Sequence, residues 1–133
     1  MEELSPGVRT LLEGRNWCNL ATVMKDGSPQ VTPMWVDTDG RHVLVNTAVG
    51  RVKVGNVERD NRVALSVFDH SDPRRRVLIR GRVVEVTKNG ADEHINKLAQ
   101  KYRGEATYRA RRSGEQRIIL KILPEHVNSS GVD

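Results

Sequence analysis

The feature that most constrains this chain is a series of short segments in which apolar and polar residues alternate. Residues 17–24 alternate in this way, as expected of a half-buried strand. Asp26 and Gly27 follow, and this pair is a strong signal for a tight hairpin turn. Further strands are predicted at 29–37, 41–47, 62–69, 74–86 and 117–123. Because two short turns join the first three strands, these strands predict an antiparallel meander.

Few helices are expected beside the six strands. Residues 5–14 begin with a capping serine and a proline suited to the first turn. Residues 91–103 repeat apolar side chains at spacings of three and four. The long strand at 74–86 is interrupted by Gly81, where we expect a bulge or a bend. Six mainly antiparallel strands with few short helices predict a small β-barrel.

The length of the chain fits one domain. All 133 residues are assigned to it, and no composition shift marks a second domain. The last strand is expected to stop at Pro124, and residues 128–133 are expected to form a flexible tail. A barrel of this size is too narrow to hold a planar cofactor inside. A ligand is therefore expected on the outer wall or between two copies of the chain.

Several classes of protein and site are disfavoured by the composition. There is no apolar run of 18 residues and no leader-like start, so a soluble cytoplasmic protein without a membrane segment is expected. Cys18 is the single cysteine, which excludes an intrachain disulfide and a cysteine-rich metal site. The four histidines are scattered without metal-ligand spacing, so no metal site is predicted. No catalytic triad or other catalytic side chain stands out.

The charge of the chain favours an anionic partner. The net charge is +5, and arginines gather between 74 and 82 and between 109 and 112. Aromatic residues make up only 4% of the chain, too few for a platform that stacks single-stranded nucleic acid. Nucleic acid is therefore not the expected partner.

Residues 46–65, with the sequence NTAVGRVKVGNVERDNRVAL, can be interpreted in two ways. Arg51 and Lys53 alternate with valines, which describes a short strand with one basic face. Alternatively, a helix that begins near Gly50 would direct free backbone N–H groups outward, and the two cations in its first turn would add charge to an anion site. Periodicity and propensity do not decide between the strand and the helix.

The same stretch carries a motif, R-x-K-x-x-N-x-x-R-D-x-R, at residues 51–62. It follows a G-x-P piece at 27–29 and precedes an R-G-R piece at 80–82. In this order and spacing, the three pieces resemble the split β-barrel flavin and deazaflavin family that includes pyridoxamine 5′-phosphate oxidase. More narrowly, they resemble the branch that uses coenzyme F420. The resemblance covers roughly residues 10–125.

The resemblance implies an FMN-binding type of split barrel and a homodimer with two cofactors in grooves between the subunits. It favours a helix at 51–59, begun at Gly50, with Arg51 and Lys53 on the cofactor phosphate. Asn46 and Thr47 would approach the ribityl chain or the phosphate. The second strand would lie along the ring of the cofactor through Gln30, Val31, Thr32, Pro33, Met34 and Trp35. For Met34 and Trp35, barrel and dimer packing is expected in preference to a role in a substrate box.

The partner subunit would cover the far edge of the site with Arg74, Arg75, Arg76 and Val77. Many relatives carry an aromatic residue at this place. The three arginines suit the polyglutamate tail of F420, or they form a solvated basic loop.

The function implied is hydride transfer from the reduced deazaflavin to an electron-poor small-molecule acceptor. Two alternatives remain open. One is an FMN-dependent enzyme like pyridoxamine-phosphate oxidase, and the other is a non-catalytic F420-binding protein.

Overall fold

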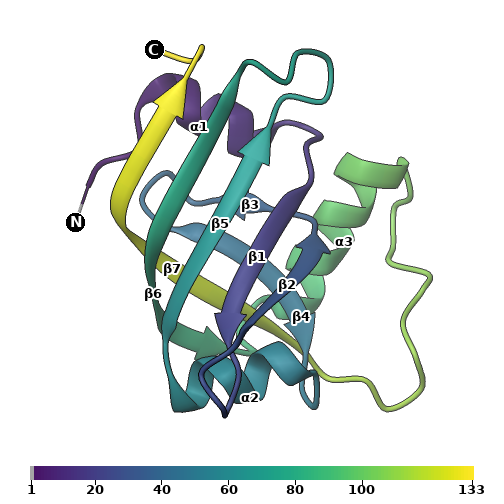
Figure 1. Ribbon diagram of the computed structural model, residues 1–133. Helices are drawn as coiled ribbons and strands as arrows, with labels where there is room; N and C mark the ends of the chain where they lie inside the picture. The colour runs from purple at the N-terminus through teal and green to yellow at the C-terminus, as the bar shows by residue number, and fades with distance from the viewer. Residues whose placement is uncertain (1) are drawn as a thin grey trace.

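The computed structural model describes residues 2–133 as a curled antiparallel sheet with three short helices (Figure 1). The elements in chain order are α1 (Pro6–Glu13), β1 (Cys18–Val23), β2 (Pro29–Met34), β3 (Asp37–Thr38), β4 (Val43–Ala48), α2 (Val52–Arg59), β5 (Arg62–Phe68), β6 (Arg76–Thr87), α3 (Ala91–Arg103) and β7 (Arg117–Ser130).

The strands form one sheet in the order β2-β1-β5-β6-β7-β4-β3, and every pairing is antiparallel. The mainly β split barrel predicted from the sequence is confirmed, but the sheet has seven strands where six were expected. The predicted strand at 29–37 ends at Met34, and a separate strand, β3, pairs with β4. Between them, side chains of α3 satisfy the backbone of Val36: its N–H donates to Tyr102 Oη at 3.0 Å, and its carbonyl accepts from Lys101 Nζ. This stretch therefore does not join the ladder.

The predicted three-stranded meander is wrong. The β1–β2 hairpin forms, but β2 lies at one end of the strand order whereas β4 lies near the other, beside β7. The third strand of the predicted meander thus lies in a different part of the curled sheet from the first two. The two ends of the sheet leave a gap in the barrel wall, and the candidate site lies there.

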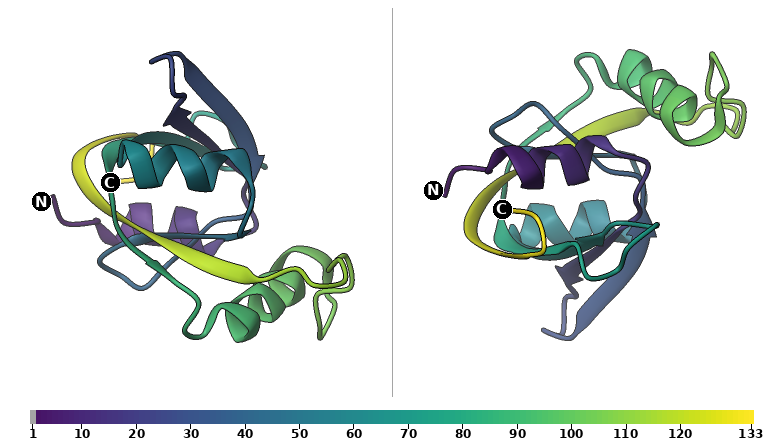
Figure 2. Two further views of the ribbon diagram at one scale, coloured as in Figure 1. Left: turned by 90° about the horizontal axis from the view of Figure 1, so that it is seen from below. Right: turned by 90° about the horizontal axis from the view of Figure 1, so that it is seen from above.

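The core fills the inside of the curled sheet. Leu20, Ile79, Leu120 and Ile122 are fully buried within it, on strands that alternate inward and outward side chains. Figure 2 shows α1 and α2 at opposite ends of the barrel and α3 outside it. Apolar side chains of α1 and α2 join the same core cluster, so the two helices close the barrel ends.

Gly81 marks the expected irregularity in β6. The pairing of β6 with β7 shifts register between Arg80 and Gly81, opposite Pro124. A Cβ at Gly81 would lie 2.0 Å from the carbonyl oxygen of Leu123, so only glycine allows the strands to approach this closely. The bulge also accommodates a proline, because its missing N–H falls where the ladder is irregular.

The sequence predicted that the last strand would stop at Pro124. This prediction is wrong, because β7 continues to Ser130. Of the predicted tail at 128–133, the first three residues pair with the start of β6, and the side chain of Val132 is buried. The Asp133 carboxylate accepts hydrogen bonds from Ser5 Oγ and from the Gly7 N–H at 3.2 and 3.1 Å.

Cys18 is buried in the core, and burial raises the pKa of its thiol to about 12, so it packs as a small apolar side chain. Among residues 2–133, no helix has the length and apolar character that crossing a bilayer requires. The same residues contain no group of three His, Cys, Asp or Glu side chains placed to hold a metal ion.

Candidate functional site

The residues that follow β4 form a helix, and not the short basic strand that the sequence also allowed. Helix α2 runs from Val52 to Arg59 with Arg51 at its N-cap. Gly50 turns the chain into it with a φ of 94°, a conformation that favours glycine. The N–H groups of Val52 and Lys53 have no acceptor among residues 2–133, as is general for the first turn of a helix. The N-terminus of α2 therefore offers donors to an anion.

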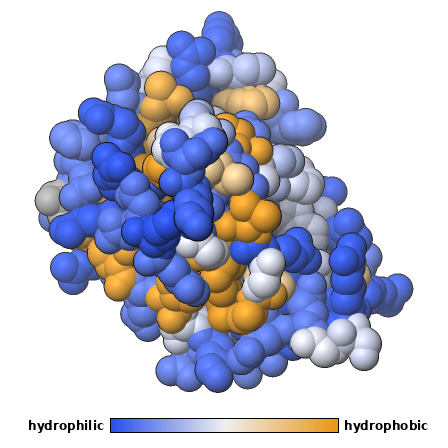
Figure 3. Space-filling model, turned by 60° about the horizontal axis from the view of Figure 1, so that its bottom comes forward, coloured by the Kyte–Doolittle hydropathy of each residue, from blue (hydrophilic) through white to orange (hydrophobic). Residues whose placement is uncertain are grey.

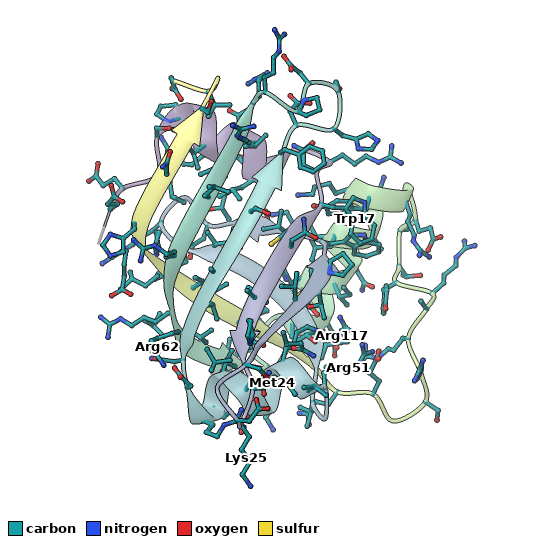
Figure 4. The ribbon with its side chains drawn as sticks, in the orientation of Figure 1. Trp17, Met24, Lys25, Arg51, Arg62 and Arg117 are labelled. Carbon is teal, nitrogen blue, oxygen red and sulfur yellow. The ribbon has the colours of Figure 1, made fainter. Side chains whose placement is uncertain are left out.

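A pocket of about 190 Å³ lies at this helix end, and we call it the α2 pocket. Figure 4 shows Arg51 and Arg117 side by side there, with Trp17 further along the same side of the molecule. Seven of the residues predicted for cofactor binding line it: Pro33, Met34, Trp35, Asn46, Thr47, Arg51 and Lys53. Five lining residues were not predicted: Trp17, Ile95, Arg103, Tyr108 and Arg117.

The other predicted residues of β2 lie outside the pocket lining. Gln30 accepts a hydrogen bond from Thr22 on the neighbouring strand at 3.1 Å. Val31 points outward from the sheet and is 61% exposed. Thr32 Oγ1 is buried and finds no hydrogen-bond partner in the described chain. An unsatisfied hydroxyl is costly, but Thr32 Oγ1 has no open surface and lies outside the pocket lining, so a ligand in the pocket does not reach it.

The predicted segment 74–77 lies at the opposite end of the molecule from α2 (Figure 1). Arg74 binds the Asp72 carboxylate through two nitrogens, and Arg75 pairs with Asp69 at 3.4 Å. Val77 is fully buried, which leaves only its backbone for a ligand. Within one chain, the segment and the α2 pocket are separate. A shared site would need the segment of a second subunit, as the resemblance implies.

Cations outnumber anions in the α2 pocket. Arg51 and Arg117 both pair with Glu115, at 3.1 and 3.3 Å. Lys53 is only 9% exposed and has neither an ion pair nor a side-chain hydrogen bond among residues 2–133. Burial, with Arg51 and Arg117 nearby, lowers the pKa of Lys53. The Lys53 ammonium opens into the pocket, where its partly desolvated charge is unfavourable without a counterion, and a bound anion would remove that cost.

A buried polar chain holds Arg117 in place. The amide oxygen of Asn46 accepts from Arg117 Nε at 2.9 Å, and its Nδ2 donates to the Ala91 carbonyl at 2.9 Å. Nδ2 also lies 3.1 Å from His94 Nδ1, so this ring nitrogen is the acceptor. The other nitrogen of His94 then donates to Asp37 at 3.0 Å. The Asn46 amide has one orientation that satisfies all these partners, and this orientation fixes Arg117.

Asp37 is the last residue of this buried hydrogen-bond network. Burial alone would raise its pKa, but hydrogen bonds from His94, the Thr38 backbone and Lys97 outweigh burial and bring the pKa to about 2. Asp37 is therefore a carboxylate throughout the physiological range, and it keeps the His94 proton on the nitrogen that faces it.

Aromatic side chains form one wall of the pocket. The Trp35 and Tyr102 rings stack with centroids 5.1 Å apart, and Trp17 and Tyr108 meet the Trp35 ring edge-on at 6.4 and 6.1 Å. The Arg117 guanidinium lies 5.1 Å from the centre of the Tyr108 ring. Burial raises the pKa of Tyr102 to about 12, and its hydroxyl donates to the Asn16 carbonyl at 2.6 Å. Tyr102 thus supports the wall and does not exchange protons at neutral pH.

The rest of the R-x-K motif has a structural role. Asn56 is buried and donates to Thr22 Oγ1 on β1 at 2.9 Å. Arg59 donates to Asn56 Oδ1 and to the Val23 carbonyl. Asp60 pairs with Arg62 at 2.7 Å. These residues fix α2 against β1, so that Arg51 and Lys53 keep their position at the pocket.

The sequence contained little signal for the pocket residues that were missed. Arg117 and Tyr108 stand more than fifty residues after Lys53, and only the pairing of β4 with β7 brings Arg117 beside Asn46. Trp17 was assigned to a strand, and His94 was treated as one of four scattered histidines.

Known proteins resemble this chain in sequence and in fold. A family model described as pyridoxamine 5′-phosphate oxidase matches residues 4–131. The chain belongs to this family. The pyridoxamine 5′-phosphate oxidase family indicates an oxidoreductase of the split-barrel type, a fold that binds flavins such as FMN. No curated protein sequence matches the chain significantly.

Solved structures share the fold of this family member. One named F420 reductase is 29% identical with a TM-score of 0.80, and the match covers 90% of this chain and 94% of that one. A conserved hypothetical protein from Mycobacterium tuberculosis is 22% identical with a TM-score of 0.71, covering 92% and 81%. A putative pyridoxamine 5′-phosphate oxidase from Listeria innocua is 18% identical with a TM-score of 0.68, covering 90% and 92%.

Proposed function

We propose that this chain is an oxidoreductase that binds coenzyme F420 and transfers a hydride from the reduced deazaflavin to an electron-poor small molecule. The observation that carries the proposal is the unneutralised charge of Lys53 at the N-terminus of α2, beside Arg51 and Arg117. The likeness to a structure named F420 reductase supports F420 as the cofactor.

The residues of the α2 pocket fit such a cofactor. Its phosphate would be held by Arg51, Lys53 and the free N–H groups of α2. Arg117 adds a third cation, held ready by Asn46. Asn46 and Thr47 are expected at the ribityl chain. Pro33, Met34 and Trp35 would follow the ring.

The cofactor supplies the hydride, and the chain supplies binding, orientation and shielding. The Trp35 and Tyr102 stack gives the ring a rigid apolar support, because Tyr102 is fixed by its hydrogen bond to Asn16. Water is excluded on that side of the pocket by aromatic side chains. No side chain is assigned as proton donor, and we expect solvent to deliver the proton.

We further propose that two subunits complete the site. The outer face of the sheet carries a groove of about 700 Å³ lined by β1, β2, β5, β6 and β7, with Val31 and Leu78 61% and 51% exposed. Figure 3 shows other apolar patches between hydrophilic side chains on the side of the molecule that is turned forward there. Pairing of two such faces would cover Val31 and Leu78, and it would allow residues 74–77 of one subunit to approach the pocket of the other.

FMN is the second candidate cofactor, because the family is named for pyridoxamine 5′-phosphate oxidase and its fold binds flavins. Both cofactors carry an anionic group and a ribityl chain, so the α2 pocket suits either. FMN gives a yellow protein with an oxidised-flavin spectrum, whereas F420 has a single deazaflavin band. A titration of the purified protein with each cofactor distinguishes them.

The test compares F420 and FMN binding in the wild type, in two pocket variants and in one control variant. Arg51→Ala and Lys53→Ala should each weaken binding by about 1.5–3 kcal/mol, the scale of a charge-assisted hydrogen bond. Arg62→Ala is a matched control, since Arg62 belongs to the same motif but pairs with Asp60. Unchanged affinity in both pocket variants would contradict the phosphate assignment.

Turnover decides between an enzyme and a binding protein. Reduced F420 should be oxidised when quinones, enones, nitro compounds or tetrapyrroles are supplied. Tight binding with no oxidation by any of them would favour a protein that stores or shields the cofactor.

A further inference from the structure

A second hollow adjoins the α2 pocket. It measures about 700 Å³ and is formed by the end of α1, residues 14–17, the loop 69–75 and the end of α3. We call it the α1 groove. Trp17, Trp35 and Arg103 line both the α1 groove and the α2 pocket, so the two hollows share one wall. A volume of this size suits a small organic molecule.

The shared wall concentrates the aromatic residues of the chain. The sequence has two tryptophans and two tyrosines, and all four belong to the one stacked cluster. Trp17 nevertheless keeps 51% of its surface exposed, although it contacts both Trp35 and Tyr102. A large exposed ring held against other rings presents a flat apolar surface to a ligand.

Arginines surround this flat surface. Arg15 and Arg103 have neither an ion pair nor a side-chain hydrogen bond among residues 2–133, and the Arg103 guanidinium lies 5.5 Å from the centre of the Trp35 ring. Arg75 pairs with Asp69 at 3.4 Å, and Asp69 is the one carboxylate that lines the groove. The groove therefore has three guanidinium groups for one carboxylate. Guanidinium groups bind carboxylates through two parallel hydrogen bonds.

We propose that the α1 groove binds a planar, conjugated carboxylate. Its ring system lies against Trp17, and its carboxylate meets Arg15 and Arg103. Trp17, Trp35 and Arg103 stand between this ligand and the cofactor ring proposed for the α2 pocket, so the groove is a site for a second ligand and not for direct hydride transfer. Binding of the carboxylate needs no cofactor and can be tested without one.

The first test titrates the cofactor-free protein with 2-naphthoate and with 2-naphthamide, its neutral analogue, by calorimetry. Naphthoate should bind about ten-fold more tightly, the lower end expected for a charged hydrogen bond. Equal affinities would overturn the carboxylate assignment, and so would tighter binding of 2-naphthyl phosphate than of naphthoate. Absence of binding would overturn the site.

Variants locate the bound probe. Arg15→Gln and Arg103→Gln should each weaken naphthoate binding several-fold, as expected for the loss of a charged hydrogen bond. Neither variant should change the binding of naphthamide. Trp17→Leu should weaken both probes. Arg41→Gln removes the same charge from an exposed turn outside the groove and should have no effect. Wild-type affinity in both arginine variants would contradict the proposal.

Arg51→Ala separates this inference from the proposed function. The variant should lose cofactor affinity and keep naphthoate binding, because Arg51 lines only the α2 pocket. Loss of naphthoate binding in Arg51→Ala would place the probe in the α2 pocket and overturn the inference. If the wild type binds naphthoate but neither F420 nor FMN, the proposed function fails and the anion site in the α1 groove stands.

Discussion

Lys53 carries a positive charge that no side chain of residues 2–133 neutralises. The R-x-K motif predicted that Lys53 binds the cofactor phosphate. The motif did not show why the charge of Lys53 lacks a counterion. The cause is tertiary: α2 buries the side chain, and β7 adds the cation of Arg117. Arg117 itself could not be predicted, since nothing in the local sequence distinguishes it from the exposed arginines that precede it.

Anion binding should therefore depend on pH through Lys53. Burial and the neighbouring arginines lower its pKa in the free protein, and a bound phosphate would raise it again. Affinity for the cofactor phosphate is full at pH values below the pKa that Lys53 has in the free protein. It falls as pH rises through that pKa, which lies below the ordinary lysine value of 10.5.

Cofactor titrations between about pH 7 and pH 10.4 check this expectation, the upper limit being the ordinary lysine pKa. Lys53→Arg keeps its charge in that range and should give a flat profile. A wild-type profile as flat as that of Lys53→Arg would refute the role of Lys53.

Two His–Asp pairs in this chain differ in burial but not in distance. His94 and Asp37 lie 3.0 Å apart and are buried, whereas His42 and Asp39 lie 3.0 Å apart near the surface. His94→Phe leaves Asn46 without one acceptor and should lower the free energy of unfolding by about 1–3 kcal/mol. His42→Phe should cost less than about 1 kcal/mol.

Urea denaturation measures both changes in stability. His94→Phe should also weaken cofactor binding, because Arg117 loses part of the chain that orients it. A stable His94→Phe variant with wild-type affinity would show that the buried polar chain does not position Arg117.

At the scale of elements, strands were more predictable than their ends. Alternation identified the strands at 17–24, 62–69 and 74–86. Their predicted ends differ from the observed ends by up to two residues. The strand predicted at 29–37 failed because Tyr102 and Lys101, from α3, bind the backbone of Val36. Pro124 was taken as a stop, although a bulge in β7 at Glu125, opposite Arg80 and Gly81, accommodates it. Both errors arise from contacts between segments far apart in the sequence.

Two glycines should respond in opposite ways to alanine. At Gly81, the new Cβ would meet the Leu123 carbonyl at 2.0 Å, so the backbone must shift, and overpacking of this kind costs about 1–3 kcal/mol. At Gly55, in α2, nothing lies within 4 Å, and alanine should stabilise the protein by about 0.5–1 kcal/mol. Thermal denaturation of the two variants measures the contrast, and equal effects would contradict it.

For the whole molecule, the fold class followed from the strand pattern, and the site depended on long-range contacts. Short alternating strands suffice to predict a curled antiparallel sheet, because such strands must bury one face. The order of strands was not predictable, since β2 and β4 have only the short β3 between them in the chain but lie far apart in the strand order. The pocket draws on residues of both β2 and β4, and seven of its twelve lining residues were predicted from the family resemblance whereas five emerged only from the structure.

The proposed dimer gives a prediction at this scale. Leu78→Lys places a charge on the outer face without touching the core, since the side chain is 51% exposed in one chain. It should turn a dimer into a monomer in sedimentation experiments and weaken cofactor binding if two subunits share each site. Gln100→Lys, on the exposed side of α3, is the control. A wild-type monomer, or a Leu78→Lys dimer with unchanged affinity, would contradict the shared site.

The contacts of Asp133 with Ser5 and Gly7 place the C-terminal residue beside the start of α1. A short linker could therefore join Asp133 to the segment that precedes α1, and new ends could open in the turn at Asp26 and Gly27, which lies outside the α2 pocket and the α1 groove. Such a circular permutant would keep every residue of both hollows on the same strands and helices. It would also put the new ends beside α2, where a fused domain could report on the occupied pocket.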